Sequence, residues 1–229
     1  MQKKTPGFEE INCLDAPLAD KLAAFFDHME DALPDFARVY SALVDRLLAA
    51  NAGSQAPEIG SVLPAFLLPD NEGRLISSAD LLSSGPLVVS FNRGHWCNFC
   101  WFELLALVEI YPEIKRLGGE IVSIMPERAA PVRRLRETFD IPFRILTDMD
   151  NCYALTCGLM VSLGNAVREL YLGVGIDLAE YQGNDAWFVP IPATYVIGTD
   201  GRVHDRFVDP DFSRRMAPDD ILECLKQIS

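Results

Sequence analysis

Two cysteines three positions apart are the residues of this chain best suited to chemistry. Cys97 and Cys100 lie in the segment 96–100, WCNFC, and thiols at this spacing can open and close a small disulfide. Residues 86–91 before them form a short, β-branched, apolar run typical of a buried parallel strand, and apolar residues at helical spacing follow them. The pattern predicts redox chemistry at a junction between a strand and a helix.

The predicted helix N-terminus gives the two thiols different roles. Unpaired backbone N–H groups and the helix dipole stabilise an anion there, so Cys97 should ionise more readily than a free cysteine, whose pKa is about 8.5. Cys100 lies one turn further along, on the same helix face, beneath the apolar cover of Trp96 and Trp101. We therefore expect Cys97 to attack first as a thiolate and Cys100 to resolve the oxidised sulfur that forms on it.

Metal, haem and purely structural interpretations of the motif are less favoured. Zinc usually requires a second pair of ligands at comparable spacing, and the chain has no second CxxC, while Cys152 and Cys157 have no histidine nearby. A c-type haem requires a histidine directly after the second cysteine, where this chain has Trp101. Two cysteines that only pack as small hydrophobic residues are disfavoured by the polar residues 93–95 just before them. We expect no metal.

The composition bounds the class of protein. With 229 residues and 49% hydrophobic content, the chain is long enough for one domain with a sizeable core and an extension. Its formal net charge of −13 argues against a nucleic acid or an anionic membrane surface as a partner. The sequence shows neither a signal-peptide core nor a run of membrane-spanning length, and its six cysteines do not form a disulfide scaffold. We therefore expect a cytoplasmic protein in a reducing compartment.

Residues 1–56 are predicted to form a helical extension and a linker. Residues 15–50 have the pattern of two amphipathic helices with Pro17 and Pro34 in their first turns, and residues 51–57 are rich in small and polar residues. The apolar helix faces favour packing against a core or a second subunit, so we interpret the extension as structural and as compatible with a homodimer.

The domain over residues 57–229 is predicted to have an α/β fold. Residues 69–73 carry a turn signal between two short strands, which indicates a hairpin. Strands and helices then alternate, which implies parallel pairing with helices covering the sheet. The predicted strands are 87–91, 120–125, 143–146, 193–198 and 202–208, and the predicted helices are 97–117, 130–139, 150–157 and 218–228. Pro112 is expected to kink or break the first of these helices near Ile110.

Residues 161–190 form a longer connection than usual and could act as a lid. This connection leads directly into Pro192, so Trp187 and Phe188 are expected either to border the two cysteines or to belong to the core. Residues 173–175, GVG, do not complete a dinucleotide-binding fingerprint. Neither a nicotinamide nor a flavin is implied, and no cofactor is expected.

The four remaining cysteines are interpreted as packing residues. Cys152 and Cys157 fall on a predicted helix, and Cys13 and Cys224 are treated in the same way. Each of them could also be a remote resolving thiol, but Cys100 is closer in sequence to the attacking cysteine and makes that role unnecessary.

Residues 91–100, FNRGHWCNFC, followed by Glu103-Leu104, resemble the active-site segment of peroxiredoxin-like proteins. These proteins form the alkyl hydroperoxide reductase/thiol-specific antioxidant (AhpC/TSA) group of the thioredoxin superfamily. Residues 64–66 and 191–197 extend the likeness, which runs from about Pro57 to the C-terminus. The resemblance implies a thioredoxin-like fold, with a central mixed sheet flanked by helices and a helical extension before it.

Pro192 resembles the cis-proline of thioredoxin-like proteins, which packs against the CxxC and lets the neighbouring backbone pair with an incoming disulfide substrate. We expect a cis peptide bond before Pro192 and assign this residue to substrate binding. The alternative is a trans proline that opens an edge strand.

Three positions depart from the family pattern. Typical members have Thr or Ser three residues before the attacking cysteine, Pro seven residues before it, and a peroxide-binding Arg in a later strand, where this chain has Gly94, Ser90 and Pro192. Peroxide reduction requires hydrogen-bond donors aimed at the O–O bond, because the leaving oxygen gathers negative charge. Since Gly94 offers only its backbone, Arg93 or His95 would have to supply these donors.

Arg93 and His95 are candidate catalytic residues with simpler alternatives. His95 could stabilise the Cys97 thiolate or protonate a leaving group, or it could be a solvent-exposed loop residue. Arg93 could raise the electrostatic potential at Cys97 or pair with a surface carboxylate. The predicted site has Cys97, Cys100, Arg93 and His95 as catalytic residues and Gly94, Trp96, Pro192 and Trp187 as substrate-binding residues.

The resemblance implies a thiol-dependent oxidoreductase. In the preferred interpretation Cys97 attacks a peroxide and becomes a sulfenic acid, which condenses with Cys100 to a disulfide that a thioredoxin- or glutathione-type donor reduces. In a second interpretation the same cysteines exchange with protein or small-molecule disulfides, as Pro192 and the missing Thr and Arg would favour. In a third, the chain is a redox sensor or scaffold whose CxxC closes without turnover and whose helical extension binds a partner.

Overall fold

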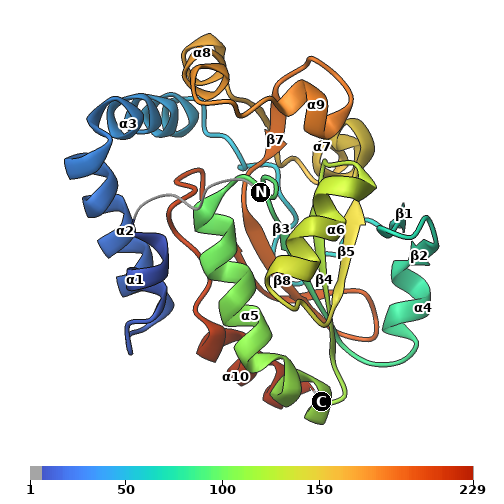
Figure 1. The fold of residues 1–229 in the computed structure, drawn as a ribbon. Coiled ribbons are helices and arrows are strands. Elements are labelled where there is room, and N and C mark those ends of the chain that lie inside the picture. Colours follow the sequence, from blue (N-terminus) through green and yellow to red (C-terminus); the bar gives the residue numbers. More distant parts are fainter. Residues whose placement is uncertain (1–6, 229) are drawn as a thin grey trace.

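The computed structural model describes residues 7–228, and its centre is a five-stranded mixed sheet (Figure 1). The strand order is β5-β4-β3-β8-β9, in which β3, β4 and β5 are parallel and β8 is antiparallel to both β3 and β9. The strands span Leu87–Phe91 (β3), Glu120–Met125 (β4), Arg144–Thr147 (β5), Ala193–Ile197 (β8) and Val203–Val208 (β9). The predicted α/β fold with a central mixed sheet is confirmed.

Each face of the sheet buries its own apolar core. Because side chains alternate along a strand, Val88 faces one core and Val89 the other, and both are fully buried. The helices α5 (Asn98–Arg116), α6 (Ala129–Thr138) and α10 (Pro218–Ile228) contribute to the first core, and α7 (Cys152–Thr156) contributes to the second. Figure 1 shows α5 and α6 in front of the strands.

Three helices form the N-terminal part of the described chain. They are α1 (Phe8–Asn12), α2 (Leu18–Ala32) and α3 (Pro34–Ala49), drawn in blue at the left of Figure 1. An aromatic cluster joins α1 and α2 to α5, with ring centroids 4.6–6.4 Å apart, and it consists of Phe8, Phe25, Phe99 and Phe102. α3 packs against α2. The two helices predicted over residues 15–50 are confirmed, whereas α1 has no counterpart in the predicted elements.

Residues 161–190 are organised by a small sheet and two helices. β6 (Met160–Ser162) and β7 (Phe188–Pro190) pair in antiparallel fashion, and between them lie α8 (Asn165–Gly173) and α9 (Leu178–Gln182). α8 packs against α3, at the top of Figure 1. This connection therefore brings the N-terminal helices into contact with the segment that leads back into the central sheet.

The remaining elements lie at the periphery. The predicted hairpin is formed by β1 (Leu67–Pro69) and β2 (Leu75–Ser77), and the short helix α4 (Ser78–Leu82) follows it. A 3-10 turn, Met149–Asn151, precedes α7. None of the helices in the described part of the chain is long and apolar enough to cross a membrane.

Two expectations about prolines differ from the structure. α5 continues through Pro112, so the expected break is wrong and a kink stays a prediction; Leu107 and Ile114 on either side of Pro112 are buried in the core and hold the helix in place. The bond before Pro192 is trans, as are all peptide bonds in residues 7–228, so the expected cis bond is wrong. The chain passes from β7 into β8 without a turn that would require the cis isomer, which is less stable by about 0.5–1 kcal/mol. Since β8 lies between β3 and β9, it is not an edge strand either.

Candidate active site

The end of β3 and the beginning of α5 place the two cysteines. Cys97 is the N-cap residue of α5, and its carbonyl accepts the first helical hydrogen bonds from the backbone N–H groups of Cys100 and Trp101, at 3.0 and 3.1 Å. Both cysteines are free thiols, and 3% of Cys97 and 0% of Cys100 is exposed. The predicted position at a strand-to-helix junction is confirmed, and both sulfurs are shielded from bulk solvent.

The surroundings of the two thiols separate their pKa values. Burial alone would raise the pKa of Cys97, but a hydrogen bond from the Cys100 thiol, the positive charges of Arg93 and Arg215, and the Cys100 backbone N–H lower it to about 6. Burial, the same hydrogen bond and the negative charge of Cys97 hold the pKa of Cys100 well above its usual value. At neutral pH Cys97 is therefore a thiolate and Cys100 a thiol.

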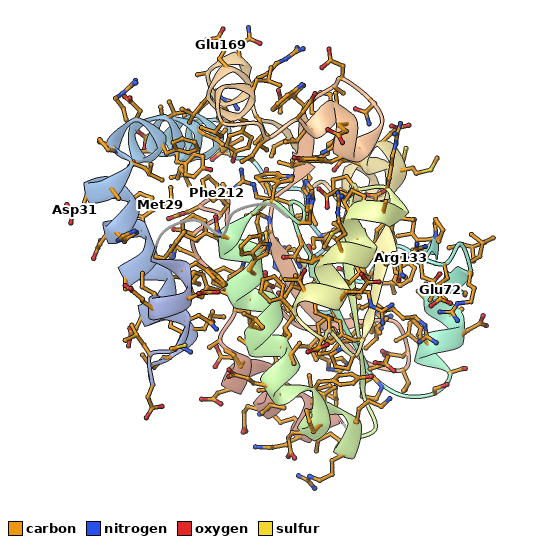
Figure 2. All side chains as sticks on the ribbon, in the orientation of Figure 1. Met29, Asp31, Glu72, Arg133, Glu169 and Phe212 are labelled. Atoms are coloured by element: carbon orange, nitrogen blue, oxygen red, sulfur yellow. The ribbon has the colours of Figure 1, made fainter. Side chains whose placement is uncertain are left out.

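Arg93 is a buried cation whose charge acts on Cys97. It is 1% exposed, and its Cζ lies 3.9 Å from the ring centroid of Phe212 and 5.0 Å from that of Trp96. Nη2 donates a hydrogen bond to the Tyr171 hydroxyl at 3.2 Å, and Nε has no acceptor among residues 7–228. Figure 2 shows Phe212 beside the N-terminal end of α5. The alternative of a surface ion pair is wrong, and the charge of Arg93 acts on Cys97 instead.

Two buried tyrosine hydroxyls extend this cluster to the N-terminal helices. Tyr40 on α3 and Tyr171 on α8 are 131 positions apart in the sequence, and their hydroxyl oxygens are 2.8 Å apart. Tyr40 also packs edge-on against Phe212, with ring centroids 5.0 Å apart. Burial raises the pKa of both tyrosines, so both keep their hydroxyl protons. Neither tyrosine was among the predicted site residues.

His95 is held by a buried carboxylate. Its Nδ1 and its backbone N–H each lie 2.7 Å from one carboxylate oxygen of Glu127, and its ring packs on Tyr181. Its carbonyl accepts a hydrogen bond from the Trp101 indole at 2.6 Å. The alternative of a solvent-exposed loop histidine is therefore wrong. Glu127, which the sequence analysis did not single out, fixes the loop that carries Cys97.

The loop conformation excludes a threonine-like donor at Gly94. The φ angle of Gly94 is 149°, and a Cβ atom there would lie 2.5 Å from Trp96 Nε1 and 2.8 Å from Glu127 Oε1. The Trp96 ring itself is buried against Tyr171, with centroids 5.1 Å apart, and its Nε1 has no acceptor in the described part of the chain. A side-chain donor at this site must therefore come from other residues.

Trp187 is a core residue of the 161–190 connection. It is 3% exposed, its indole N–H donates to Asp185 at 2.9 Å, and the Arg168 guanidinium lies over its ring with Cζ 5.5 Å from the centroid. Of the two expectations for Trp187, burial in the core is the one that its surroundings support.

Pro192 lies beside the segment that leads to the cysteines. The next residue, Ala193, pairs with Phe91 at the end of β3. The backbone N–H of Ile191 donates to the Leu159 carbonyl at 2.7 Å, so the donor preceding Pro192 is already engaged. The pairing with an incoming disulfide that a cis-proline would permit is not available to this N–H.

A second buried arginine, Arg215, reaches the cysteines from the loop between β9 and α10. Its Nη2 donates to the Cys100 sulfur at 3.6 Å, and its Nε donates to Glu103 Oε2 at 2.7 Å. Glu103 stands one turn after Cys100 on α5, and its Oε1 accepts hydrogen bonds from Ser90 and Thr194, both at 2.9 Å. None of Ser90, Glu103 and Arg215 is among the predicted site residues.

The four other cysteines differ in exposure. Cys157 and Cys224 are buried, as predicted for packing residues. Cys13 and Cys152 are exposed, because Cys13 follows α1 and Cys152 begins α7 on the solvent side, so the packing interpretation is wrong for them. Within residues 7–228, no group of three or more His, Cys, Asp or Glu side chains is arranged to hold a metal ion.

Comparisons with known proteins cover the region of the CxxC. The sequence model of the AhpC/TSA family matches residues 59–206. A thiol-disulfide oxidoreductase ResA from Bacillus thuringiensis is 26% identical over 157 residues, which cover 69% of this chain and 73% of that protein. A putative peroxiredoxin bcp from Coxiella burnetii is 23% identical over 117 residues, which cover 51% of this chain and 76% of that protein.

A solved structure has the same fold. The crystal structure of the peroxidoxin BcpB from Mycobacterium tuberculosis matches with a TM-score of 0.59 and 21% identity, over 76% of this chain and 99% of that chain. At this level of identity the likeness concerns the fold, and it confirms the predicted thioredoxin-like arrangement of sheet and helices. The region matched by the family model ends before Arg215.

Proposed function

The chain belongs to the AhpC/TSA family of the thioredoxin superfamily, and we propose that it is a thiol-dependent oxidoreductase that reduces small peroxides through Cys97 and Cys100. The observation that carries this proposal is a buried thiolate paired with a second thiol. Cys97 has a pKa of about 6 and accepts a hydrogen bond from Cys100. The pair supplies both a nucleophile and the group that can resolve its oxidised form.

The burial of Cys97 favours a small oxidant. Only 3% of the residue is exposed, and Trp96 and Trp101 beside it are also buried. A peroxide can reach the sulfur with less rearrangement than a protein disulfide. Arg93 Nε–H and Trp96 Nε1–H are buried without acceptors among residues 7–228, and we assign them as donors to the peroxide oxygens, in place of the family's Thr and Arg.

In the first step the Cys97 thiolate attacks the terminal oxygen of a peroxide ROOH. The S–O bond forms as the O–O bond breaks, so the sulfur is oxidised to a sulfenic acid and the peroxide is reduced. The Arg93 guanidinium stabilises the departing RO⁻, which takes a proton from water and becomes ROH. His95, fixed by Glu127, holds the loop that presents the thiolate.

In the second step the Cys100 sulfur attacks the sulfenic acid on Cys97, and a disulfide and water form. A thioredoxin- or glutathione-type donor then supplies two thiols, which return two electrons and two protons to the disulfide. The family likeness supports a donor of this type, and the CxxC spacing supports a disulfide within one chain.

Thiol–disulfide exchange through the same CxxC is the second candidate. It is favoured by the similarity to a protein named thiol-disulfide oxidoreductase, which extends over 69% of this chain. The burial of Cys97 and the engaged backbone donor before Pro192 count against a protein disulfide as the substrate.

Stopped-flow tryptophan fluorescence of the reduced protein separates the candidates, because Trp96 and Trp101 adjoin the cysteines. We expect a rapid change with hydrogen peroxide, a slow change with a disulfide-bonded peptide, and no change with either in Cys97→Ser. Cys152→Ser removes an exposed thiol and is the matched control, so it should behave like the wild type.

Two other outcomes would replace the proposal. A fast reaction with the disulfide and a slow reaction with peroxide would identify an exchange enzyme. Oxidation of Cys97 without turnover in the presence of a thiol donor would identify a redox sensor or scaffold.

A further inference from the structure

Arg215 is the charged side chain that touches the resolving cysteine. It lies between β9 and α10, and its Nη2 is 3.6 Å from the sulfur of Cys100, 115 positions earlier in the sequence. Its side chain is 1% exposed, so water and dissolved ions screen this contact little.

The other donors of Arg215 anchor its guanidinium. Nε donates to Glu103 at 2.7 Å, and Nη1 donates to the carbonyls of Phe212 and Arg214, the latter at 2.7 Å. A guanidinium is planar, so its N–H groups have fixed directions relative to one another. With Nε and Nη1 held, Nη2 is aimed at Cys100.

Glu103 is fixed in turn by the central sheet. Its Oε1 accepts hydrogen bonds from the hydroxyls of Ser90 and Thr194, both at 2.9 Å. Ser90 on β3 and Thr194 on β8 are partners in the strand register. Two strands, α5 and the loop before α10 therefore combine to direct one N–H group at the resolving sulfur.

The need for this N–H group is greatest after Cys97 has been oxidised. In the reduced protein, burial and the Cys97 thiolate raise the pKa of Cys100, while Arg215 and Arg93 lower it. Conversion of the thiolate to a sulfenic acid removes the negative charge that opposes ionisation of Cys100. Arg215 stays in place, so Cys100 becomes easier to deprotonate at the stage when it must attack.

We propose that Arg215 is a catalytic residue of the resolving step and that Glu103 is its positioning residue; this inference rests on the proposed function. Cys100 loses its thiol proton and its sulfur attacks the Cys97 sulfur. The S–S bond forms as the S–O bond breaks, and the departing hydroxide takes up the proton to become water. Arg215 donates a hydrogen bond to the Cys100 thiolate while the negative charge is present on it.

Arg215→Met tests this role in stopped-flow fluorescence with peroxide. The first phase depends on peroxide concentration and reports attack by Cys97, whereas the second does not and reports disulfide formation. We expect the second phase to slow by about 10- to 100-fold, as for loss of a hydrogen bond to a charged group, and its pH midpoint to rise. The first phase, measured at mildly alkaline pH where Cys97 stays ionised, should change far less.

Three further variants control the experiment. Arg214→Met is the matched control, because Arg214 is the neighbouring arginine and pairs at the surface with Asp209, so both phases should match the wild type. Arg215→Lys keeps a positive charge without the fixed fork and should restore part of the second phase. If Arg215→Met fails to fold because Glu103 is left unpaired, the double variant Glu103→Gln/Arg215→Met removes both charges and gives the same readout.

A second reagent separates this inference from the proposed function. Methyl methanethiosulfonate converts the Cys97 thiolate to a mixed disulfide, from which Cys100 then displaces methanethiol. If peroxide gives no first phase, the proposed function fails, while slower methanethiol release in Arg215→Met than in Arg214→Met would still support the inference. If folded Arg215 variants form the disulfide between Cys97 and Cys100 as fast as the wild type, with whichever of peroxide and methyl methanethiosulfonate reacts, Arg215 has no catalytic role and the inference is overturned.

Discussion

Two buried arginines act on the CxxC, and their surroundings differ. Arg215 forms an ion pair with Glu103 at 2.7 Å, which cancels much of its charge. Arg93 is surrounded by aromatic rings, including that of Phe212, and by the Tyr171 hydroxyl, and no carboxylate in residues 7–228 pairs with it. Arg215 is thus compensated by a carboxylate, and Arg93 is not.

Because of this difference, the two arginines influence the thiols in different ways. The effect of a paired arginine is mainly that of the hydrogen bond it donates to the neighbouring sulfur. The charge of a buried arginine without a carboxylate acts over a longer distance, because aromatic rings compensate that charge only in part. The Cys97 thiolate is the anion that balances Arg93, in agreement with its pKa of about 6. The charge of Arg93 therefore promotes ionisation of the Cys97 thiol, whereas the hydrogen bond from Arg215 assists the Cys100 thiol.

Removing Arg93 should have the largest effect. Arg93→Met removes both the balancing charge for Cys97 and a donor to the departing oxygen. We expect the second-order rate constant for hydrogen peroxide to fall by about 10²- to 10³-fold, as for loss of a preorganised donor. The pKa of Cys97 should rise, which ultraviolet absorbance of the thiolate measures directly.

The control for this variant is an arginine in a similar but exposed setting. Arg168 lies over the Trp187 ring with its side chain 40% exposed, so Arg168→Met should keep the wild-type rate. If Arg93→Met ionises and reacts like the wild type, the field of Arg93 does not govern Cys97, and the contrast between the two arginines disappears.

The next largest effect is a loss of folding stability when the ion pair of Arg215 with Glu103 is removed. Glu103→Gln leaves Arg215 with a neutral acceptor, so the free energy of unfolding should drop by about 2–3 kcal/mol. Arg93→Met should lose less than Glu103→Gln, because the Cys97 thiolate that Arg93 balances can take up a proton and no carboxylate loses its partner. Glu113→Gln, in an exposed pair with Arg116 on the same helix, should leave the free energy of unfolding close to that of the wild type, because solvent screens this pair. Urea denaturation checks all three values, and equal losses in Glu103→Gln and Arg93→Met would contradict the comparison.

The parts of the site that the sequence predicts are local ones. The strand before the CxxC and the helix after it each leave a periodic pattern in their own residues, so Cys97 could be placed at the helix N-terminus. The same signal predicts the strands of the central sheet and the helices over residues 15–50. Arg93 and His95 became candidates because they adjoin the cysteines in the chain.

The parts that the sequence does not predict are contacts between distant segments. Arg215 and Glu103 are 112 positions apart, and no periodicity connects them. Glu103 alone carried a signal, since a carboxylate within an apolar stretch of a buried helix requires a buried partner. The trans bond before Pro192 likewise follows from the path between β7 and β8, which residue types alone do not fix.

The pH dependence of the first step sharpens the comparison further. Peroxide reacts with the thiolate, so the rate constant should be constant above the Cys97 pKa of about 6 and fall about tenfold for each pH unit below it. Because Arg93 lowers this pKa more than Arg215 does, the midpoint should move upward further in Arg93→Met than in Arg215→Met. Equal shifts in the two variants would assign both arginines the same role, and a wild-type rate that keeps rising at alkaline pH would show that the pKa is not lowered.

The smallest expected effect is that of Tyr40, and it tests whether the N-terminal helices influence Cys97 through Arg93 without influencing Cys100. The Tyr40 hydroxyl lies 2.8 Å from that of Tyr171, which accepts the hydrogen bond from Arg93 at 3.2 Å. Tyr40→Phe removes the outer hydroxyl, keeps the ring against Phe212 and leaves Tyr171 bound to Arg93. We expect peroxide attack to slow by about two- to fivefold, equivalent to about 0.4–1 kcal/mol, with the resolving phase unchanged.

Tyr111→Phe is the matched control for this variant, because the Tyr111 hydroxyl bonds to Glu120 near the other end of α5. Stopped-flow traces of both variants should show a change in the first phase for Tyr40→Phe and in neither phase for Tyr111→Phe. If Tyr40→Phe slows the resolving phase as much as the first phase, α3 influences both thiols. Arg93 and Arg215 would then belong to one coupled network, because removal of the Tyr40 hydroxyl, which is linked to Arg93 through Tyr171, would also change the reaction of Cys100.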